Sequence, residues 1–373
     1  MLELTNLRHG AVLNHHDGYE TSAGLEVILE GLAPSMAQVK VNGKPATRCG
    51  RNFKAPVLLT AQFNEIVVTA NDKFGEMQRK IQVVWDKKSY PRYNFFIDDN
   101  IFFLTDVARQ KPATLFDHFY LKALRETHRR YGTKFTLNLF YHNDHDDFSL
   151  KDFPDNYKGE FQENSDWLKM SFHAYSEFPD RPYQHATAEK LAHDYDLLHS
   201  EIVRFAGEES FIEPVVIHWG MVHPDHFSVL TDRGCRVLSG SFMDSKTYVG
   251  EHDTKESVCD VGYYQDADTA TWLLAKRRLF DFNHGLCWEK NNLCCNLVSQ
   301  TEINEILNSS LTAEYTADTV NLASHEQYSF PYYFNYLPDH LERIDLAARL
   351  VTEKGFKPVF YSHGFLGNTA WEK

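Results

Sequence analysis

Runs in which apolar and polar residues alternate fill the first part of the chain, up to about residue 88. Valine or isoleucine recurs at every second position in these runs, which predicts short strands that each bury one face. The clearest runs cover residues 25–31, 37–43, 64–72 and 77–86. Turn-forming residues such as Asn42 and Gly43 separate them, and none has helical spacing. The pattern predicts an immunoglobulin-like β-sandwich over residues 1–88.

From residue 89 onwards, strand-like apolar runs alternate with amphipathic segments of helical spacing. The predicted strands are residues 93–100, 134–142, 167–175, 214–220, 235–242, 319–328 and 356–362. The predicted helices are residues 115–131, 188–205, 226–233 and 337–355. Two of the helices are followed by a glycine, Gly132 and Gly207, as at a helix C-terminus. Such alternation predicts a parallel sheet, either open or closed into a (β/α) barrel.

The alternation fails between residues 243 and 319, where short strand-like runs and polar turns take over. We interpret this stretch as an insertion with its own structure. The predicted organisation is therefore a β-sandwich over residues 1–88, followed by an α/β domain over residues 89–373 that carries the insertion.

Composition and charge exclude several classes of function. The chain has 52 acidic residues against 38 Lys and Arg, a formal charge of −14, so no basic surface is expected for nucleic acid or anionic lipid. No apolar run reaches the ~18–20 residues that cross a bilayer, and the first residues lack the features of a signal peptide. We expect a cytoplasmic protein, or one whose leader is missing from this chain, with no nucleic-acid or membrane partner.

Four of the predicted strands end in titratable residues, at the edge where parallel α/β proteins place their functional groups. These residues are Asp98 with Asp99, His173, His218, and His325 with Glu326. Two adjacent carboxylates after a buried strand repel each other unless a cation or a shared proton relieves them. One carboxylate of such a pair can bind a metal while the other acts as a base. Helix-capping aspartates and packed core histidines are the alternative interpretation of the same residues.

The residues next to these histidines extend the candidate site. His173 is followed four positions later by Glu177, and both can reach one cation if the segment coils. His218 precedes Trp219, which would place an aromatic wall beside an imidazole ligand. His325 is suited to proton donation, and Tyr328 begins an aromatic run that would wall a groove for a sugar.

Together these residues resemble the polysaccharide deacetylases, the NodB-homology group or carbohydrate esterase family 4. The resemblance covers roughly residues 90–361, interrupted by the insertion. That family is a distorted (β/α) barrel, similar to a TIM barrel, whose first strand ends in an Asp-Asp pair, here Asp98 and Asp99. Its last motif, a strand ending in Leu-His before a helix and a Gly-Phe turn, is similar to NLASHEQY and LAARLVTEKGF here, which places His325 at the general-acid position.

The resemblance implies a divalent metal, zinc, bound by Asp99, His173 and a third group. In the family's second motif a histidine stands where this chain has Glu177, and the arginine of the third motif is absent where His218 occurs. The third ligand is therefore His218 or Glu177, and we favour His218.

The resemblance also implies roles for the remaining candidates. Asp98 would act as the base towards water and His325 as the acid towards the leaving group, with Glu326 as a further catalytic residue. Trp219 and Tyr328 would contact the substrate.

We therefore expect a metal-dependent hydrolase of carbohydrate metabolism that removes an acyl group from a sugar or oligosaccharide. Two alternatives stay open. The first is a barrel that binds a glycan in the same groove without catalysis. The second is a glycosidase or lyase that uses Asp98 and Glu326, which would stand ~5–5.5 Å apart in a retaining glycosidase and ~6.5–9.5 Å apart in an inverting one.

Overall fold

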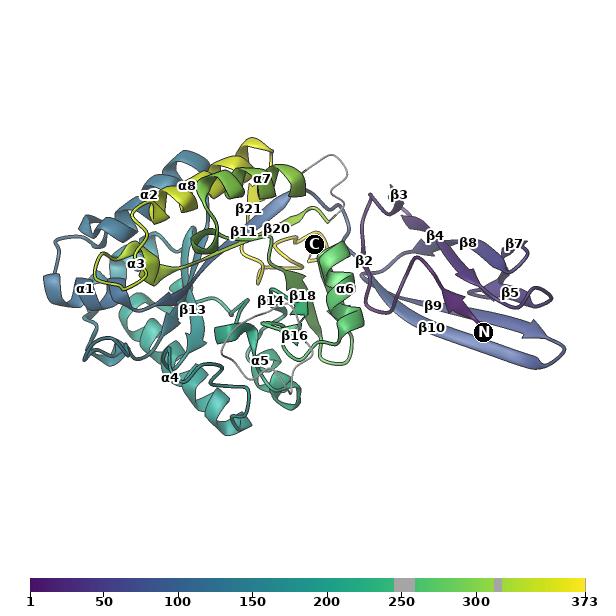
Figure 1. Ribbon diagram of the computed structural model, residues 1–373, viewed down its shortest axis with the longest axis horizontal. Helices are drawn as coiled ribbons and strands as arrows, with labels where there is room; N and C mark the ends of the chain where they lie inside the picture. The colour runs from purple at the N-terminus through teal and green to yellow at the C-terminus, as the bar shows by residue number, and fades with distance from the viewer. Residues whose placement is uncertain (245–258, 312–316, 373) are drawn as a thin grey trace. The chain divides into compact units, whose positions relative to one another are not determined.

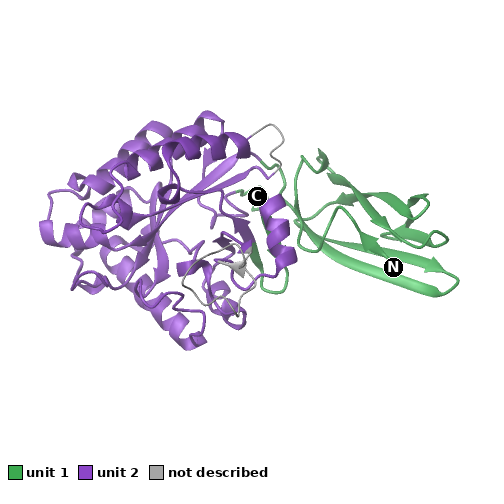
Figure 2. Ribbon diagram, in the orientation of Figure 1, with its two compact units in different colours: residues 1–89, 278–287, 368–373 green, residues 90–277, 288–367 purple. Residues whose placement is uncertain are grey.

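The computed structural model of the protein describes residues 1–244, 259–311 and 317–372, which divide into two compact units. The first unit consists of residues 1–89, 278–287 and 368–373, and the second of residues 90–277 and 288–367 (Figure 2). The sequence pattern places residues 278–287 and 368–373 in the second domain. In the structure, however, Phe280 contacts Phe63 with ring centroids 5.1 Å apart, and Trp371 contacts Trp85 at 5.2 Å. Aromatic contacts therefore join both late segments to the N-terminal strands.

Two sheets make up the N-terminal part of the first unit (Figure 1). One has the order β1-β4-β8-β7 with β3 paired to β4, and the other has the order β2-β10-β9-β5-β6. The strands are β1 (Glu3–Leu4), β2 (Val12–Leu13), β3 (Gly18–Thr21), β4 (Gly24–Leu32), β5 (Gln38–Val41), β6 (Lys44–Pro45), β7 (Thr47–Cys49), β8 (Asn52–Leu59), β9 (Phe63–Asp72) and β10 (Gly75–Trp85). Buried and exposed side chains alternate along β4, β8 and β9, so each sheet has one covered face, as in a β-sandwich.

The four predicted strands of this region are confirmed as β4, β5, β9 and β10, whereas β8 was not predicted. Its buried positions alternate regularly, but Pro56 interrupts the run, and proline lacks the N–H that a central strand needs. In the structure β7 pairs with β8 only up to Lys54, so Pro56 lies beyond that pairing. Pro56 itself lies opposite Ile28 of β4, so β8 is paired on one side only at this residue.

A parallel sheet forms the centre of the second unit. Its order is β13-β12-β11-β20-β19, and β21 also pairs with β11. The strands are β11 (Arg92–Asn100), β12 (Phe135–Phe140), β13 (Leu168–Ala174), β19 (Leu293–Cys294), β20 (Thr319–His325) and β21 (Lys357–Pro358). Every residue of β11 and β12 is buried, which explains their continuous apolar runs, since both faces of the sheet are covered.

Helices pack on this sheet, with α2, α8 and α7 side by side and α4 against β13 (Figure 1). The helices are α1 (Phe102–Gln110), α2 (Phe119–Tyr131), α3 (Lys158–Glu163), α4 (Ala188–Ala206), α5 (Phe227–Thr231), α6 (Ala267–Lys276), α7 (Gln300–Ser310) and α8 (His340–Glu353). Among the described residues no strand pairing joins the edges β13 and β19, so the expected barrel is not closed by a continuous ring of strands. In the same part of the chain, no helix is long and apolar enough to cross a membrane.

Two predictions of secondary structure were wrong. Residues 214–220 were expected to form a strand, but the chain runs irregularly into the 3₁₀ turn η5 (His218–Gly220). Pro214 has no N–H to pair, and Trp219 has a φ of 62°, which a strand does not accommodate. The stretch 243–319 was expected to contain only short strands and turns.

That stretch contains helices α6 and α7 and supplies the edge strand β19 of the main sheet. Its residues 245–258 and 312–316 lie outside the described part of the chain. The remaining short strands of the chain are β14 (Val237–Gly240), β15 (Met243–Asp244), β16 (Cys259–Asp260), β17 (Arg278–Asp281) and β18 (Leu286–Lys290). The stretch is therefore part of the architecture rather than a separate insertion.

Candidate metal centre

The ends of three strands of one parallel sheet bring most of the candidate residues together. Strand β11 carries Asp98 and Asp99 near its end, β13 carries His173, and β20 ends at His325. Strands β11 and β20 pair in a register that places Asp98 opposite His325. Because parallel strands end at the same edge of a sheet, these groups share one edge. His218 reaches the same place from η5 rather than from a strand end.

Asp99, His173 and His218 form a buried cluster. Asp99 Oδ1 lies 3.1 Å from His173 Nε2 and 3.4 Å from His218 Nδ1, and the two nitrogens are 3.1 Å apart. Ligand atoms held ~2.0–2.1 Å from a tetrahedral zinc ion stand about 3.3 Å from one another. Asp99 Oδ1 is buried without a hydrogen-bond partner among the described residues. The spacing and the orphaned oxygen both fit one small divalent cation.

The outer contacts of the cluster favour His218 over Glu177 as its third member. His218 Nε2 lies 3.1 Å from the backbone oxygen of Glu177, so Nε2 carries the proton and the Nδ1 lone pair is available to a cation. The Glu177 carboxylate pairs instead with His145, with 2.5 Å between Oε2 and Nε2. Burial lowers the pKa of His173 to about 4, so this ring is neutral at pH 7, as metal binding requires.

Each of the two aspartates accepts a hydrogen bond from a buried side-chain amide. Asn138 Nδ2 on β12 donates to Asp98 Oδ1 at 2.7 Å, and Gln327 Nε2 donates to Asp99 Oδ2 at 3.0 Å. Asp98 Oδ1 and Asp99 Oδ2 are therefore held in place, and Asp99 Oδ1 is the oxygen that lies next to the two histidines.

The two carboxyl groups differ in acidity. Burial, and then the charge of Asp99, raise the pKa of Asp98 well above its usual value. Burial alone would also raise the pKa of Asp99, but its contacts with His173 and His218 hold that pKa well below the usual range. The pair therefore combines an ionised carboxylate with a more basic one, as a ligand and a proton acceptor require.

His325 lies beside the cluster and is held by Asn296. Its Nδ1 is 2.9 Å from Asn296 Oδ1, and Cys294 Sγ lies 3.6 Å from the same nitrogen. Because an amide oxygen only accepts, Nδ1 carries the proton and Nε2 remains for proton exchange. Burial lowers the pKa of His325, so the ring is neutral at rest.

Glu326 faces helix α1 instead of the cluster. Its oxygens accept the backbone N–H groups of Ile101, Phe102 and Phe103 at 2.7, 2.8 and 2.7 Å, and the residue is fully buried. Burial raises the pKa of Glu326 to about 8, and the three amides, which favour the ionised form, limit this rise. This geometry gives no support to the predicted catalytic role of Glu326, or to the glycosidase alternative that depends on it.

The two aromatic residues predicted to bind substrate border the cluster. The Trp219 ring lies 6.3 Å from that of His218, with the Arg181 guanidinium 5.4 Å from the Trp219 ring centroid. The Tyr328 ring lies 6.3 Å from that of His325. Their contact with a substrate stays a prediction.

A cavity of about 380 Å³ is lined in part by His145, whose partner Glu177 contacts His218 through its backbone oxygen. It is lined by Phe102, Thr105, Asp106, Arg109, Asn143, His145, Asp146, Tyr332, Tyr333 and Phe334. Tyr332 and Phe334 are 61% and 78% exposed, so their ring faces are accessible to a ligand. Aromatic faces beside charged and amide groups form a surface suited to a sugar ring.

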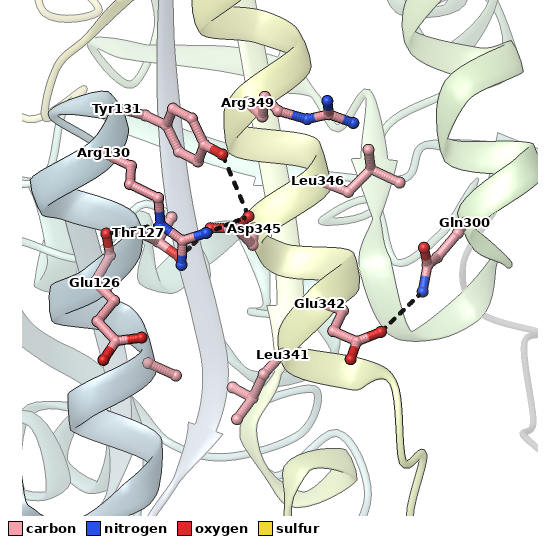
Figure 3. Close-up of a pocket in the computed structure, with 11 residues that line it drawn as sticks. Glu126, Thr127, Arg130, Tyr131, Gln300, Leu341, Glu342, Asp345, Leu346 and Arg349 are labelled. Atoms are coloured by element: carbon pink, nitrogen blue, oxygen red, sulfur yellow. Dashed lines mark hydrogen bonds and ion pairs between the residues drawn. The ribbon is translucent and has the colours of Figure 1, made fainter.

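A second hollow, of about 490 Å³, lies between α2 and α8 (Figure 3). There Thr127, Arg130 and Tyr131 all contact the carboxylate of Asp345. None of the residues that line this groove belongs to the candidate site.

Sequence reasoning missed the amide residues that hold the site. Asn138 had a visible signal, because it is a polar residue inside the apolar run of β12. Gln327 directly follows two predicted site residues, but no sequence pattern indicated that its side chain contacts Asp99. Asn296 lies in the 3₁₀ turn η7 (Cys295–Leu297), within the stretch interpreted as an insertion, and no spacing pointed to it.

Comparisons with known proteins identify no family. No protein family model matches the chain, and no curated protein matches it. Among solved structures, an engineered protein is 13% identical over 23% of this chain and 20% of its own, with a TM-score of 0.17. A tandem pair of titin immunoglobulin domains is 13% identical over 26% of this chain and 58% of its own, also with a TM-score of 0.17.

A Bacteroides fragilis protein named "putative alpha-galactosidase" is 10% identical over 95% of this chain and 78% of its own, with a TM-score of 0.32. The match spans less than two thirds of the engineered protein and of the titin pair. TM-scores this low establish no shared fold.

Proposed function

We propose that the protein is a metal-dependent hydrolase that removes an acyl group from a sugar or oligosaccharide, on a fold related to the polysaccharide deacetylase barrel. One observation carries this proposal. One side-chain oxygen or nitrogen atom from each of Asp99, His173 and His218 lies 3.1–3.4 Å from the other two. Asp98, whose carboxyl group is more basic, directly precedes Asp99 in the chain.

The three ligands would be Asp99 Oδ1, His173 Nε2 and His218 Nδ1. A zinc ion bound there would supply Lewis-acid polarisation of a water molecule and of the substrate's carbonyl oxygen. Three protein ligands leave the fourth tetrahedral position open, which is the mark of a catalytic rather than a structural zinc site.

Asp98 accepts the proton of the attacking water. Its raised pKa makes it a stronger base than an exposed aspartate, and Asn138 holds Oδ1 so that Oδ2 is left for the proton. Asp98 Oδ1 also lies 3.8 Å from His173 Nδ1, which keeps the base next to a ligand ring.

His325 protonates the leaving oxygen or nitrogen: its neutral ring first takes up at Nε2 the proton that Asp98 removed from water and then gives it to the leaving group. It stands opposite Asp98 across the β11–β20 pair, so base and acid come from neighbouring strands. Asn296 holds Nδ1, and Nε2 is therefore the atom that exchanges the proton. The lowered pKa of His325 makes its protonated form a stronger acid than a free imidazolium.

The carbohydrate assignment rests on the aromatic cavity. The exposed rings of Tyr332 and Phe334 supply stacking surfaces, and Arg109 and Asn143 in the same lining add polar groups that are paired with Asp146 and Thr105. A sugar ring has an apolar face and polar edges that match such a lining.

Metal analysis tests the proposal. The unmodified protein, loaded with zinc and desalted, should retain about one equivalent, and His218→Ala should lose most of it. His193→Ala is the matched control, since this histidine is exposed on α4 outside the cluster. Release of acetate from acetylated oligosaccharides then tests the reaction. Full zinc occupancy in His218→Ala, or no zinc in the unmodified protein, would refute the proposal.

A further inference from the structure

His325, which ends β20, and the two residues that follow it contact different parts of the proposed centre. His325 stands opposite Asp98, Glu326 accepts hydrogen bonds from the first amides of α1, and Gln327 donates to Asp99. In the chain, Asp99 is followed almost directly by α1. Gln327 and Glu326 therefore hold the two ends of the turn that runs from Asp99 into α1.

The backbone of this segment departs from a regular strand. Asp99 has a φ of 62°, in the left-handed region that residues other than glycine seldom adopt. The pairing of β11 with β12 also shifts register between Ile97 and Asn100. Such a conformation persists where the surrounding contacts over-determine it, so the neighbours of the turn are part of its stability.

Helix α1 has no cap from its own residues. Ile101, at the N-cap position, has no side-chain acceptor, and no acidic residue occurs in the first turn. The first N–H groups of a helix have no partner within the helix and need one elsewhere. Here the carboxylate of Glu326, 225 residues after Ile101, satisfies three consecutive amides.

We infer that Glu326 is a positioning residue. Together with Gln327 it locks the turn between β11 and α1, and this lock sets the direction in which Asp99 presents Oδ1. Both Glu326 oxygens are engaged by backbone amides, so the residue acts through Asp99 and not on the substrate. The inference rests on the proposed function for the identity of the centre, but the lock itself belongs to the metal-free protein.

Glu326→Gln tests the lock, because it keeps the shape of the side chain but replaces one acceptor oxygen with a donor. The control is Glu302→Gln, since Glu302 also accepts a backbone hydrogen bond at a helix start, from Ser299 at 2.7 Å, and α7 contributes no residue to the cluster. In metal-free protein, hydrogen exchange at residues 101–103 should be about 10-fold or more faster in Glu326→Gln than in the unmodified protein. The control should leave this exchange unchanged.

Cobalt binding tests whether the contacts of Glu326 with α1 affect how Asp99 binds a metal ion. In Glu326→Gln the affinity for Co²⁺ should fall by about 10-fold or more, and the visible absorption spectrum of the bound ion should change. A loss of general stability alone would move neither reading in the folded protein, and the Glu302→Gln control should match the unmodified protein in both.

Unchanged exchange at residues 101–103 in Glu326→Gln would overturn the inference. Faster exchange with unchanged cobalt affinity and spectrum would also overturn it, since the lock would then not reach Asp99. If the unmodified protein binds no cobalt, the proposed function fails, and the exchange result alone decides whether the lock exists. If Glu326→Gln does not fold, Gln327→Met removes only the donor to Asp99, and unchanged cobalt binding in that variant would overturn the inference.

Discussion

Acidification should destabilise the second unit through His340, which is not one of the proposed ligands. This histidine begins α8 and is 1% exposed. Its Nε2 lies 2.6 Å from Ser324 Oγ and its Nδ1 lies 2.7 Å from Ser329 Oγ, so both nitrogens of the neutral ring have partners. Burial lowers the pKa of His340 to about 3.

The size of the effect follows from the difference between this pKa and that of the unfolded chain, about 6.5. Because the folded pKa is the lower one, the stabilisation is fully present above about pH 6.5 and is lost as the pH falls. At pH 5 the unfolded chain binds almost one more proton at His340 than the folded chain does. The free energy of unfolding should therefore be about 2 kcal/mol lower at pH 5 than at pH 8 from this residue alone.

Urea denaturation at pH 8, 7, 6 and 5, in chelator to remove bound metal, measures this loss. His340→Asn is the comparison, since asparagine keeps a donor and an acceptor for the two serines but does not titrate. The unmodified protein should lose about 2 kcal/mol more than His340→Asn between pH 8 and pH 5, because all other titrating groups cancel in the difference. Equal losses in the two proteins would show that His340 does not stay neutral in the folded state and would refute the reasoning.

Three further predictions concern the base, a helix end and the core. Asp98→Asn should keep its zinc by elemental analysis but lower kcat by about 100-fold or more, and an unchanged kcat would exclude Asp98 as the base. Gly132→Ala should lower the free energy of urea unfolding by about 1 kcal/mol, because Gly132 ends α2 with a φ of 70°. Gly159→Ala, where the added methyl group meets nothing within 4 Å and φ is ordinary, should not be destabilising in the same assay. Phe96→Ala should cost about 3–5 kcal/mol, since Phe96 is fully buried in the central strand, and a loss below 1 kcal/mol would contradict its place in the core.

Most of the helices and strands could be predicted from the sequence, because the spacing of apolar residues is a property of the chain that does not depend on tertiary packing. The regular alternation of β9 and the helical spacing of α4 up to Gly207 could both be recognised in this way. The polar residues at the ends of β11 and β20 could be recognised as candidate site residues for a related reason. A carboxylate or imidazole that interrupts a buried run stands out, because burying it needs a partner.

Which of these residues contact one another depends on the tertiary structure. His218 reaches His173, 45 residues earlier, from a 3₁₀ turn that was predicted to be a strand. The spacing of four residues between His173 and Glu177 offered a second ligand, but the fold turns the Glu177 carboxylate to His145.

The contacts of Glu326 could not be predicted from its sequence neighbours either. Beside His325 in the sequence it suggests an acid or a base, whereas in the fold its oxygens bind the amides of α1, 225 residues away in the chain. The chemistry of a carboxylate depends on the donors and charges that surround it. Those come from distant segments whose packing no local pattern encodes.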